Sequence, residues 1–361
     1  MEEEGSEVAS PLDRLAERCA KTWPAILKAR KRTDEYLEKL QILQEFSSDN
    51  TSVVVFGSFA RRELTSGSDV DWSLLIDGPS DPAHFRIAQE VKKVFDSLGL
   101  QKPGTTDTFG ALASSHELIH HIGGVRDTNQ NTTRRMLLLL ESRAITKPIF
   151  HERVVRGILN RYITDDVSVS WSERAAGQPV PLVPRFLLND VARFWRTMAV
   201  DYAAKRWEQS DKKWALRNSK LRMSRKLLFA AGLLMCFNFD LRPPDNLEEL
   251  LADPDAIPPA LASFFLEQMR FTPIDIVSNA LLISEEQTVS KVMDAYDRFL
   301  EILDDNASRK QLEDVKFDQA ADSVLFQEIR HLSHQFQEGL TELFFDGGTR
   351  LRELAIKYGV F

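Results

Sequence analysis

The sequence predicts an α+β protein, in which a small domain with a mixed sheet is followed by a larger all-helical domain. Short β-branched or apolar runs that are bounded by turn residues are typical of strands. Such runs occupy residues 53–56, 70–76 and 105–113. From Asn131 onward the apolar residues follow helical spacing. Strands are therefore expected in the first part of the chain and helices in the rest.

The helical remainder contains several segments with one apolar side, separated by proline-rich breaks. These segments cover residues 137–141, 185–208, 215–237, 259–303 and 321–357. Three parts are expected along the chain. They are a helical segment over 1–50 that packs on the sheet domain, the sheet domain itself over 51–145, and a helical domain over 146–361.

Composition and charge are those of a folded chain. Of the 361 residues, 43% are hydrophobic and 28% are charged, which argues against disorder. No apolar stretch approaches the roughly 18 to 20 residues of a membrane span, and the acidic N-terminus does not resemble a secretory signal. A cytoplasmic location is therefore expected. Cys19 and Cys236 lack the spacing of a disulfide framework or a zinc site.

The first elements alternate between helix and strand. Apolar residues at helical spacing over 11–46 predict an amphipathic helix or helix pair. The strand over 53–56 stops at a turn, and a short helix over 59–64 follows it. After the second strand, Asp81 and Pro82 open a helix that Gly99 ends.

The segment from Gly57 to Ile76 carries the candidate chemistry. Gly57 allows the backbone to approach a phosphate, and Ser58 adds a hydroxyl and an amide at the first turn of a helix, where an anion is favoured. Asp69 and Asp71 are two residues apart on a predicted strand, so their side chains leave the same face. Paired carboxylates can share Mg²⁺ ions with substrate phosphates. The sequence therefore predicts a triphosphate cradle beside a site for two magnesium ions.

Gly-Ser, ten residues and then Asp-x-Asp on a strand resembles the signature of the DNA polymerase β nucleotidyltransferase superfamily. The longer form, with Arg-Arg-Glu-Leu and Gly-Ser-Asp-Val-Asp, is most similar to its bacterial branch related to the uridylyl- and adenylyltransferases of nitrogen regulation. The resemblance implies transfer of a nucleoside monophosphate from an NTP to a hydroxyl or phosphate, with release of pyrophosphate. It also implies that 51–145 is the catalytic domain, and our hypothesis is that the helical domain over 146–361 closes the cleft and presents the acceptor.

The superfamily needs a third carboxylate on the next strand, which takes the proton of the attacking group or holds the catalytic metal. Asp107 lies where the third strand is expected to begin, and it is the first candidate. Glu117, after an unusual Ser-Ser-His, is the alternative. A chain in which neither residue serves would bind nucleotide without turning it over.

Three residues near the cradle are further candidates for binding the nucleotide. Arg61 and Arg62 follow the cradle by one helical turn and could contact triphosphate oxygens. A solvated helix face would explain the two arginines nearly as well. Ser68, directly before the first aspartate of the pair, is expected to bind the nucleotide too.

A basic segment differs from the rest of the chain, whose net charge is −8. Residues 205–226 hold nine Lys or Arg and only two acidic residues. Lys213, Arg217 and Lys220 share one helical face by their spacing. With interleaved tryptophans, such a face suits a triphosphate or single-stranded nucleic acid, and a solvated helix face is the other interpretation.

Two more polar features leave alternatives open. Residues 123–135 form either a capped loop or part of a site for the acceptor or the base. Asp190, Arg193, Thr197 and Asp201 form a polar stripe that faces either the cleft or water.

The leading hypothesis is a metal-dependent nucleotidyltransferase that binds an NTP or dNTP with two Mg²⁺ ions, for which Mn²⁺ can substitute. One version makes an oligonucleotide without a template, as relatives of the superfamily in bacterial signalling and antiviral defence do. The other modifies a protein or small molecule with AMP or UMP. The acceptor would be single-stranded nucleic acid or a protein hydroxyl, and no membrane partner is expected. A catalytically silent nucleotide or nucleic-acid sensor is the alternative from another class.

Overall fold

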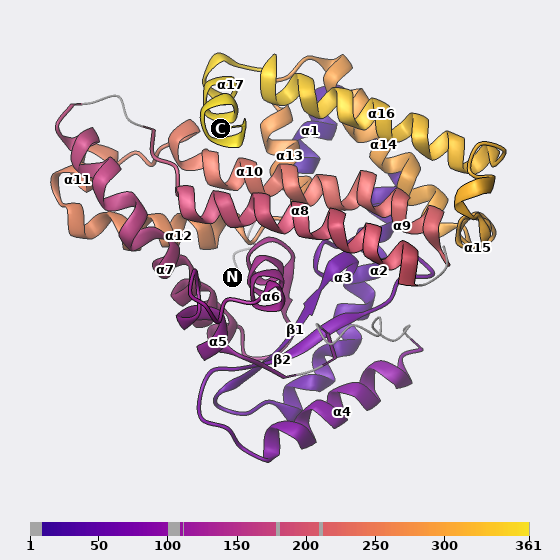
Figure 1. The fold of residues 1–361 in the computed structure, drawn as a ribbon, viewed down its shortest axis with the longest axis horizontal. Coiled ribbons are helices and arrows are strands. Elements are labelled where there is room, and N and C mark those ends of the chain that lie inside the picture. The colour runs from indigo at the N-terminus through magenta and orange to yellow at the C-terminus, as the bar shows by residue number, and fades with distance from the viewer. Residues whose placement is uncertain (1–8, 100–108, 111, 178–180, 209–211, 361) are drawn as a thin grey trace, which may run out of the picture.

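A computed structural model describes residues 9–99, 109–110, 112–177, 181–208 and 212–360 (Figure 1). A four-stranded sheet lies near the N-terminal end of the chain, and helices make up most of the rest. This arrangement confirms the predicted α+β class with a larger helical region.

The sheet is mixed, with the strand order β3-β2-β1-β4. Strand β1 runs antiparallel to both of its neighbours, and β3 runs parallel to β2. The strands are β1 (Thr51–Phe56), β2 (Asp71–Ile76), β3 (Leu112–Ser114) and β4 (Ser142–Ala144). The central position of β1 is consistent with its β-branched sequence, because all of its residues are buried.

Alternate residues of β1 enter two different cores. Val53 and Val55 pack under α4 (Ala83–Ser97) and the 3₁₀ helix η1 (Leu40–Phe46), whereas Val54 and Phe56 pack toward the helical region. This alternation follows from the two-residue period of a strand. Figure 1 accordingly shows the sheet between α4 and the helical region.

Besides α4, three shorter helices lie between the strands in the chain. They are α3 (Gly57–Ala60), α5 (Ser115–His120) and α6 (Asn129–Leu140). Helix α6 begins at an N-cap, because the Thr128 hydroxyl accepts a hydrogen bond from the Asn131 amide at 3.2 Å. The apolar run of α6 is buried against the inner face of the sheet and the helices that follow.

The helical region contains two pairs of long helices that lie side by side, α8 with α10 and α14 with α16 (Figure 1). No helix in the described part of the chain is long and apolar enough to cross a membrane. The elements of this region are α7 (Pro148–Ala175), α8 (Arg185–Glu208), α9 (Trp214–Lys220), π-helical η2 (Leu221–Arg225), α10 (Lys226–Leu241), α11 (Leu247–Ala252), η3 (Pro254–Ala256), α12 (Ile257–Gln268), α13 (Pro273–Leu281), α14 (Glu286–Asp304), α15 (Asn306–Asp314), η4 (Phe317–Gln319), α16 (Val324–Phe345), α17 (Thr349–Leu354) and π-helical η5 (Ala355–Val360).

The first two helices, α1 (Pro11–Cys19) and α2 (Pro24–Lys39), join the helical region to the sheet. Helix α1 contacts α13, and α2 contacts α14. Arg32 of α2 forms an ion pair with Asp304, and the neighbouring Thr33 hydroxyl accepts a hydrogen bond from the Leu64 amide at 3.2 Å. Helix α2 therefore contacts both α14 and the loop between α3 and β2.

Three details of the secondary structure differ from the sequence-based prediction. Strand β4 lies in a stretch predicted to be helical, and the short helix over 59–64 is instead α3, which ends at Ala60. Arg62 has a left-handed backbone with φ of 57°, which stops that helix. The described part of the third strand is only Leu112–Ser114. Short edge strands such as β4 depend on pairing with β1, so local sequence gives no signal for them.

The close approach of α14 and α16 predicts a specific sensitivity at Gly339. A Cβ atom there would lie 2.6 Å from Val292 Cγ2 and 3.1 Å from the Val292 amide nitrogen. Gly339→Ala is therefore expected to lower the free energy of unfolding by about 1–3 kcal/mol, as overpacking does. Urea denaturation measures this change.

Gly359→Ala is the control, since a Cβ atom at Gly359 meets nothing within 4 Å. Equal unfolding midpoints for the two variants would contradict the predicted overpacking at the α14–α16 contact.

Candidate active site

Three segments of the chain meet at the end of β1. Phe56, the last residue of β1, pairs with Asp71 of β2 on one side and with Ser142 of β4 on the other. Gly57 follows Phe56 directly, and Glu141 directly precedes Ser142. The sheet register therefore brings the Gly-Ser turn, the Asp-x-Asp segment and Glu141 together.

Two features at position 57 favour glycine: the backbone conformation and the close position of Asp71. The φ of Gly57 is 64°, which favours glycine, and a Cβ atom would lie 3.2 Å from Asp71 Oδ2. The Gly57 and Ser58 carbonyls accept hydrogen bonds from the Arg61 amide at 3.0 Å and the Glu63 amide at 2.7 Å. These bonds hold the turn against the carboxylate of Asp71.

The four residues of the motif are partly exposed, although many residues between them are buried. Gly57, Ser58, Asp69 and Asp71 all have intermediate exposure, whereas Phe59 is fully buried. The two aspartates therefore lie where a ligand can reach them, and the residues between and around them anchor the segment in the core.

The carboxylate of Asp71 is under electrostatic strain. Burial, together with the negative charges of Asp69 and Glu141, raises the pKa of Asp71 to about 7. Arg225 and Lys220 act in the opposite direction. A cation placed between the carboxylates would relieve this repulsion.

Glu141 is buried and accepts a hydrogen bond from Arg61 Nη1. Arg61 Nε also donates to Glu63 at 2.8 Å. Burial disfavours the charged guanidinium, but Glu63 and Glu141 outweigh it and hold the pKa of Arg61 well above its usual value. Arg61 therefore joins the loop after α3 to the end of α6, with both glutamates as partners.

Two basic residues of the helical region, Lys220 and Arg225, act electrostatically on the carboxylate of Asp71. Lys220 ends α9, and Arg225 ends η2. Burial lowers the pKa of Lys220, and the charges of Asp69 and Asp71 partly restore it. Two acidic residues from the sheet thus face two basic residues from the helices, as a site for a phosphate-metal complex requires.

The comparison with known families agrees with this geometry. Residues 38–102 match the nucleotidyltransferase domain family. The matched segment contains the whole Gly-Ser and Asp-x-Asp motif and the strands β1 and β2. No curated protein matches the chain. The chain thus contains a segment similar to nucleotidyltransferase domains, here called the nucleotidyltransferase domain, which supports nucleotidyl transfer as its general chemistry, and the helical region lies outside the match.

Two more of the predicted nucleotide-binding residues have protein partners, as Arg61 does. Arg62 forms an ion pair with Asp34 of α2. Ser68 is buried, and its hydroxyl accepts a hydrogen bond from the Thr65 amide at 2.9 Å. Ser68 thus closes the turn that leads into Asp69.

The predicted basic face of α9 divides into two parts. Lys220 faces the carboxylates of the nucleotidyltransferase domain, whereas Lys213 forms an ion pair with Glu313 at 3.1 Å. Burial lowers the pKa of Arg217, and nearby Tyr202 opposes the change. Trp214 is buried against Phe317 and Phe326 and does not form a surface for stacking bases.

The two residues predicted as the third carboxylate are Asp107 and Glu117. Asp107 lies outside the described residues. Glu117 is exposed on α5, which contacts α6 and α7. Glu141 was missed in the sequence, although it is the single charge that ends the apolar run of α6.

The described residues fit magnesium through two carboxylates rather than three. Among them, no group of three His, Cys, Asp or Glu side chains is arranged to hold a metal ion by itself. Asp69 and Asp71 supply oxygen ligands whose mutual repulsion favours a cation. Magnesium commonly takes one or two carboxylates and completes its shell with phosphates and water, so this pair fits the ion when a triphosphate is present.

Gly57→Ala is expected to be more destabilising than other substitutions at glycines with positive φ. The left-handed backbone costs about 1–2 kcal/mol for a residue with a Cβ atom, and at Gly57 the new methyl group also contacts Asp71. Gly99 has a φ of 67° and open space around it, so Gly99→Ala isolates the backbone cost. Urea denaturation of both variants gives the comparison, and equal losses would show that the contact with Asp71 is unimportant.

Asp71→Asn is expected to stabilise the metal-free protein in a pH-dependent way. Since the folded pKa of about 7 exceeds the ordinary 3.8, the folded protein binds more protons than the unfolded chain between these values. The free energy of unfolding of the unmodified protein therefore falls as pH rises from about 4 to about 7. The variant lacks this loss, so its advantage should grow with pH and level off at on the order of 4 kcal/mol, since the shift spans about three pKa units.

Thermal melting in EDTA from about pH 5 to about pH 8 measures that advantage. Asp245→Asn is the control, because Asp245 is an exposed aspartate in a loop. A stability difference that does not change with pH would contradict the raised pKa of Asp71.

Proposed function

We propose that this protein is a magnesium-dependent nucleotidyltransferase, which transfers a nucleoside monophosphate from a nucleoside triphosphate to a hydroxyl acceptor and releases pyrophosphate. The observation that carries the proposal is the position of Gly57 beside Asp71, where a Cβ atom would lie 3.2 Å from Asp71 Oδ2, as a result of the pairing of β1 with β2. It sets an anion-binding turn directly beside two partly exposed carboxylates.

The side chains around the turn have complementary roles in this proposal. Asp69 and Asp71 would hold the metal ions, which polarise the phosphoryl group and neutralise its charge when bound. The Gly57–Ser58 backbone faces the phosphates, and Lys220 and Arg225 balance charge that the two carboxylates leave uncompensated. The hydrogen bond from Arg61 to Glu141 would hold the Gly57–Ser58 turn in place.

The transfer itself is a substitution at the α-phosphorus. The acceptor oxygen forms a bond to that phosphorus while the bond to the bridging oxygen of the β-phosphate breaks. Pyrophosphate leaves with the electron pair, and the hydroxyl proton passes to a carboxylate or to water. Such reactions depend mostly on positioning and charge stabilisation, which is consistent with a site built from carboxylates, ammonium and guanidinium groups.

The products decide which acceptor is used. The purified protein is incubated with each labelled NTP and dNTP plus Mg²⁺ or Mn²⁺, and products are resolved by size. We expect metal-dependent turnover, and Asp69→Ala/Asp71→Ala should reduce it by on the order of a thousandfold. Successive products would indicate template-independent polymerisation, whereas one labelled band at the mass of the protein would indicate nucleotidylation of the protein itself.

Asp245→Ala is the matched control, since it removes an exposed carboxylate far along the chain from the motif. Turnover that persists in Asp69→Ala/Asp71→Ala would refute the proposed site. Nucleotide binding without any turnover, over all nucleotides and added oligonucleotide or protein acceptors, would instead support a catalytically silent sensor.

A further inference from the structure

A hollow lies on α8, and its lining includes neither Asp69 nor Asp71. Its volume is about 420 Å³, which falls within the range of small-molecule sites of roughly 300–1,000 Å³. All of its lining residues but one belong to α8, and the exception is the first residue of α6. The lining residues, here called the α8 pocket, are Asn129, Asn189, Arg193, Arg196, Thr197, Val200 and Asp201.

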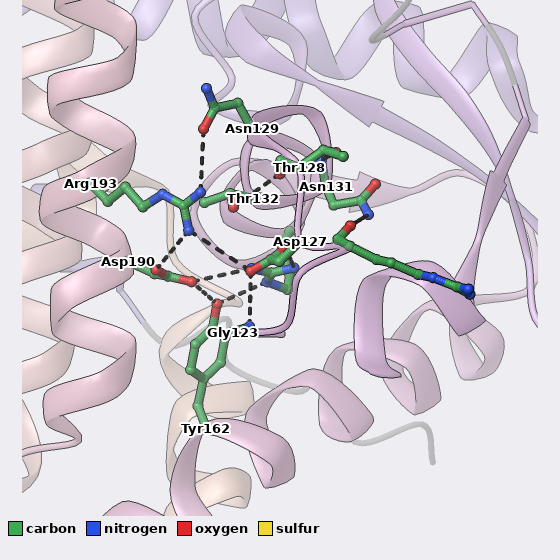
Figure 2. Close-up of polar contacts among 11 residues, drawn as sticks. Gly123, Asp127, Thr128, Asn129, Asn131, Thr132, Tyr162, Asp190 and Arg193 are labelled. Atoms are coloured by element: carbon green, nitrogen blue, oxygen red, sulfur yellow. Dashed lines mark hydrogen bonds and ion pairs between the residues drawn. The ribbon is translucent and has the colours of Figure 1, made fainter. Parts of the chain in front are cut away.

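A buried polar network lies beside Arg193, which is one of the lining residues of the α8 pocket. The fully buried Arg135 donates two hydrogen bonds of 2.9 Å to Asp127, and its Nη2 lies 3.2 Å from Asp190 Oδ2. Tyr162 donates to Asp190 and accepts from Arg135 at 2.8 Å. Figure 2 shows that this network joins the segment before α6 to α7 and α8.

Arg193 connects the network to the α8 pocket. Its guanidinium lies 3.9 Å from Asp127 and 3.8 Å from Asp190, and it donates to Asn129 Oδ1 at 3.3 Å (Figure 2). Because the two aspartates are themselves fixed by Arg135, the position of Arg193 is set before any ligand binds. Asn129 is oriented by the same contact.

The walls of the α8 pocket offer polar groups that have no partner among the residues that the structure describes. Asn189, Arg196, Thr197 and Asp201 make no side-chain hydrogen bond or ion pair within the described part of the chain. The pocket thus combines one fixed guanidinium, one free guanidinium, carboxamides and a carboxylate. Val200, whose exposed fraction is 67%, adds an apolar surface.

This set of groups matches the parts of a nucleotide. Guanidinium groups bind phosphate oxygens in a fixed geometry. Carboxamides and carboxylates bond to the donor and acceptor edges of bases, and an apolar side chain can lie against the base ring. A simple anion would leave the carboxylate of Asp201 unfavourably close, so the mixed charge favours a ligand that also carries hydrogen-bond donors.

Helix α8 also connects the α8 pocket to the carboxylate site. Met198, next to Thr197 in the chain, has its sulfur 3.2 Å from Arg225 Nη1. Arg225 is one of the two basic groups that lower the pKa of Asp71. We propose that the α8 pocket binds a nucleoside monophosphate unit, with its phosphate on Arg193 and Arg196. Its role as the acceptor of the transferred group rests on the proposed function.

The test is a binding measurement that needs no turnover. The full-length protein is titrated calorimetrically with each of the four ribonucleoside 5′-monophosphates in EDTA. At least one should bind, and Arg196→Gln should weaken that binding about tenfold or more, as loss of a charged hydrogen bond does. Arg196 is exposed, so this variant should melt at the temperature of the unmodified protein.

Two controls assign the binding to the α8 pocket. Arg352→Gln changes an exposed arginine of α17 and should leave binding unchanged. Asp69→Ala/Asp71→Ala should retain binding while it loses turnover. The proposal is overturned if no monophosphate binds, if Arg196→Gln has no effect, if the double variant abolishes binding, or if inorganic phosphate binds as tightly as the nucleotide.

The same experiment separates the two proposals. Binding that depends on Arg196 in a protein without turnover would sustain the α8 pocket and refute the transferase function. Turnover together with monophosphate binding that is insensitive to Arg196→Gln would do the reverse.

Discussion

Pairing of β1 with both of its neighbours brings the acidic groups of the site together. Phe56 lies opposite Asp71 on one side and Ser142 on the other. The end of β1 and the beginnings of β2 and β4, which are distant in sequence, therefore meet at one end of the sheet. A shift of one residue in either pairing would turn these side chains toward the opposite core. The buried alternation of Val53, Val54 and Val55 prevents such a shift, since each face of β1 has its own apolar partners.

Concentrated negative charge is the cost of this arrangement, and distant parts of the chain offset it. Arg61 satisfies Glu141 and Glu63 within the core, and Lys220 and Arg225 approach from α9 and η2. Even so, Asp71 keeps a strongly raised pKa in the metal-free protein. Binding sites are often held in such unfavourable states, because the ligand supplies the missing charge.

Local sequence was sufficient to predict the α+β class, with a small sheet followed by a larger helical region, because strand and helix periods are local properties. The pairing of β1 with β2, which sets Gly57 beside Asp71, is a tertiary contact. The surroundings of those residues were not predictable in the same way. Arg61 and Arg62 looked like free cations, but their partners Glu141 and Asp34 are distant in sequence. Trp214 looked available for stacking, but it is covered by aromatic residues about a hundred positions later. Such pairings depend on tertiary contacts that no spacing rule encodes.

The two faces of β1 also bear on how the protein could have been assembled. Val54 and Phe56 belong to the same core as residues of α1, α7 and α10, and α2 connects α14 with the loop before β2. The nucleotidyltransferase domain is therefore not a portable module that could be excised or exchanged between chains. A fragment ending after β4 would expose an apolar surface on the inner side of its sheet and would tend to aggregate.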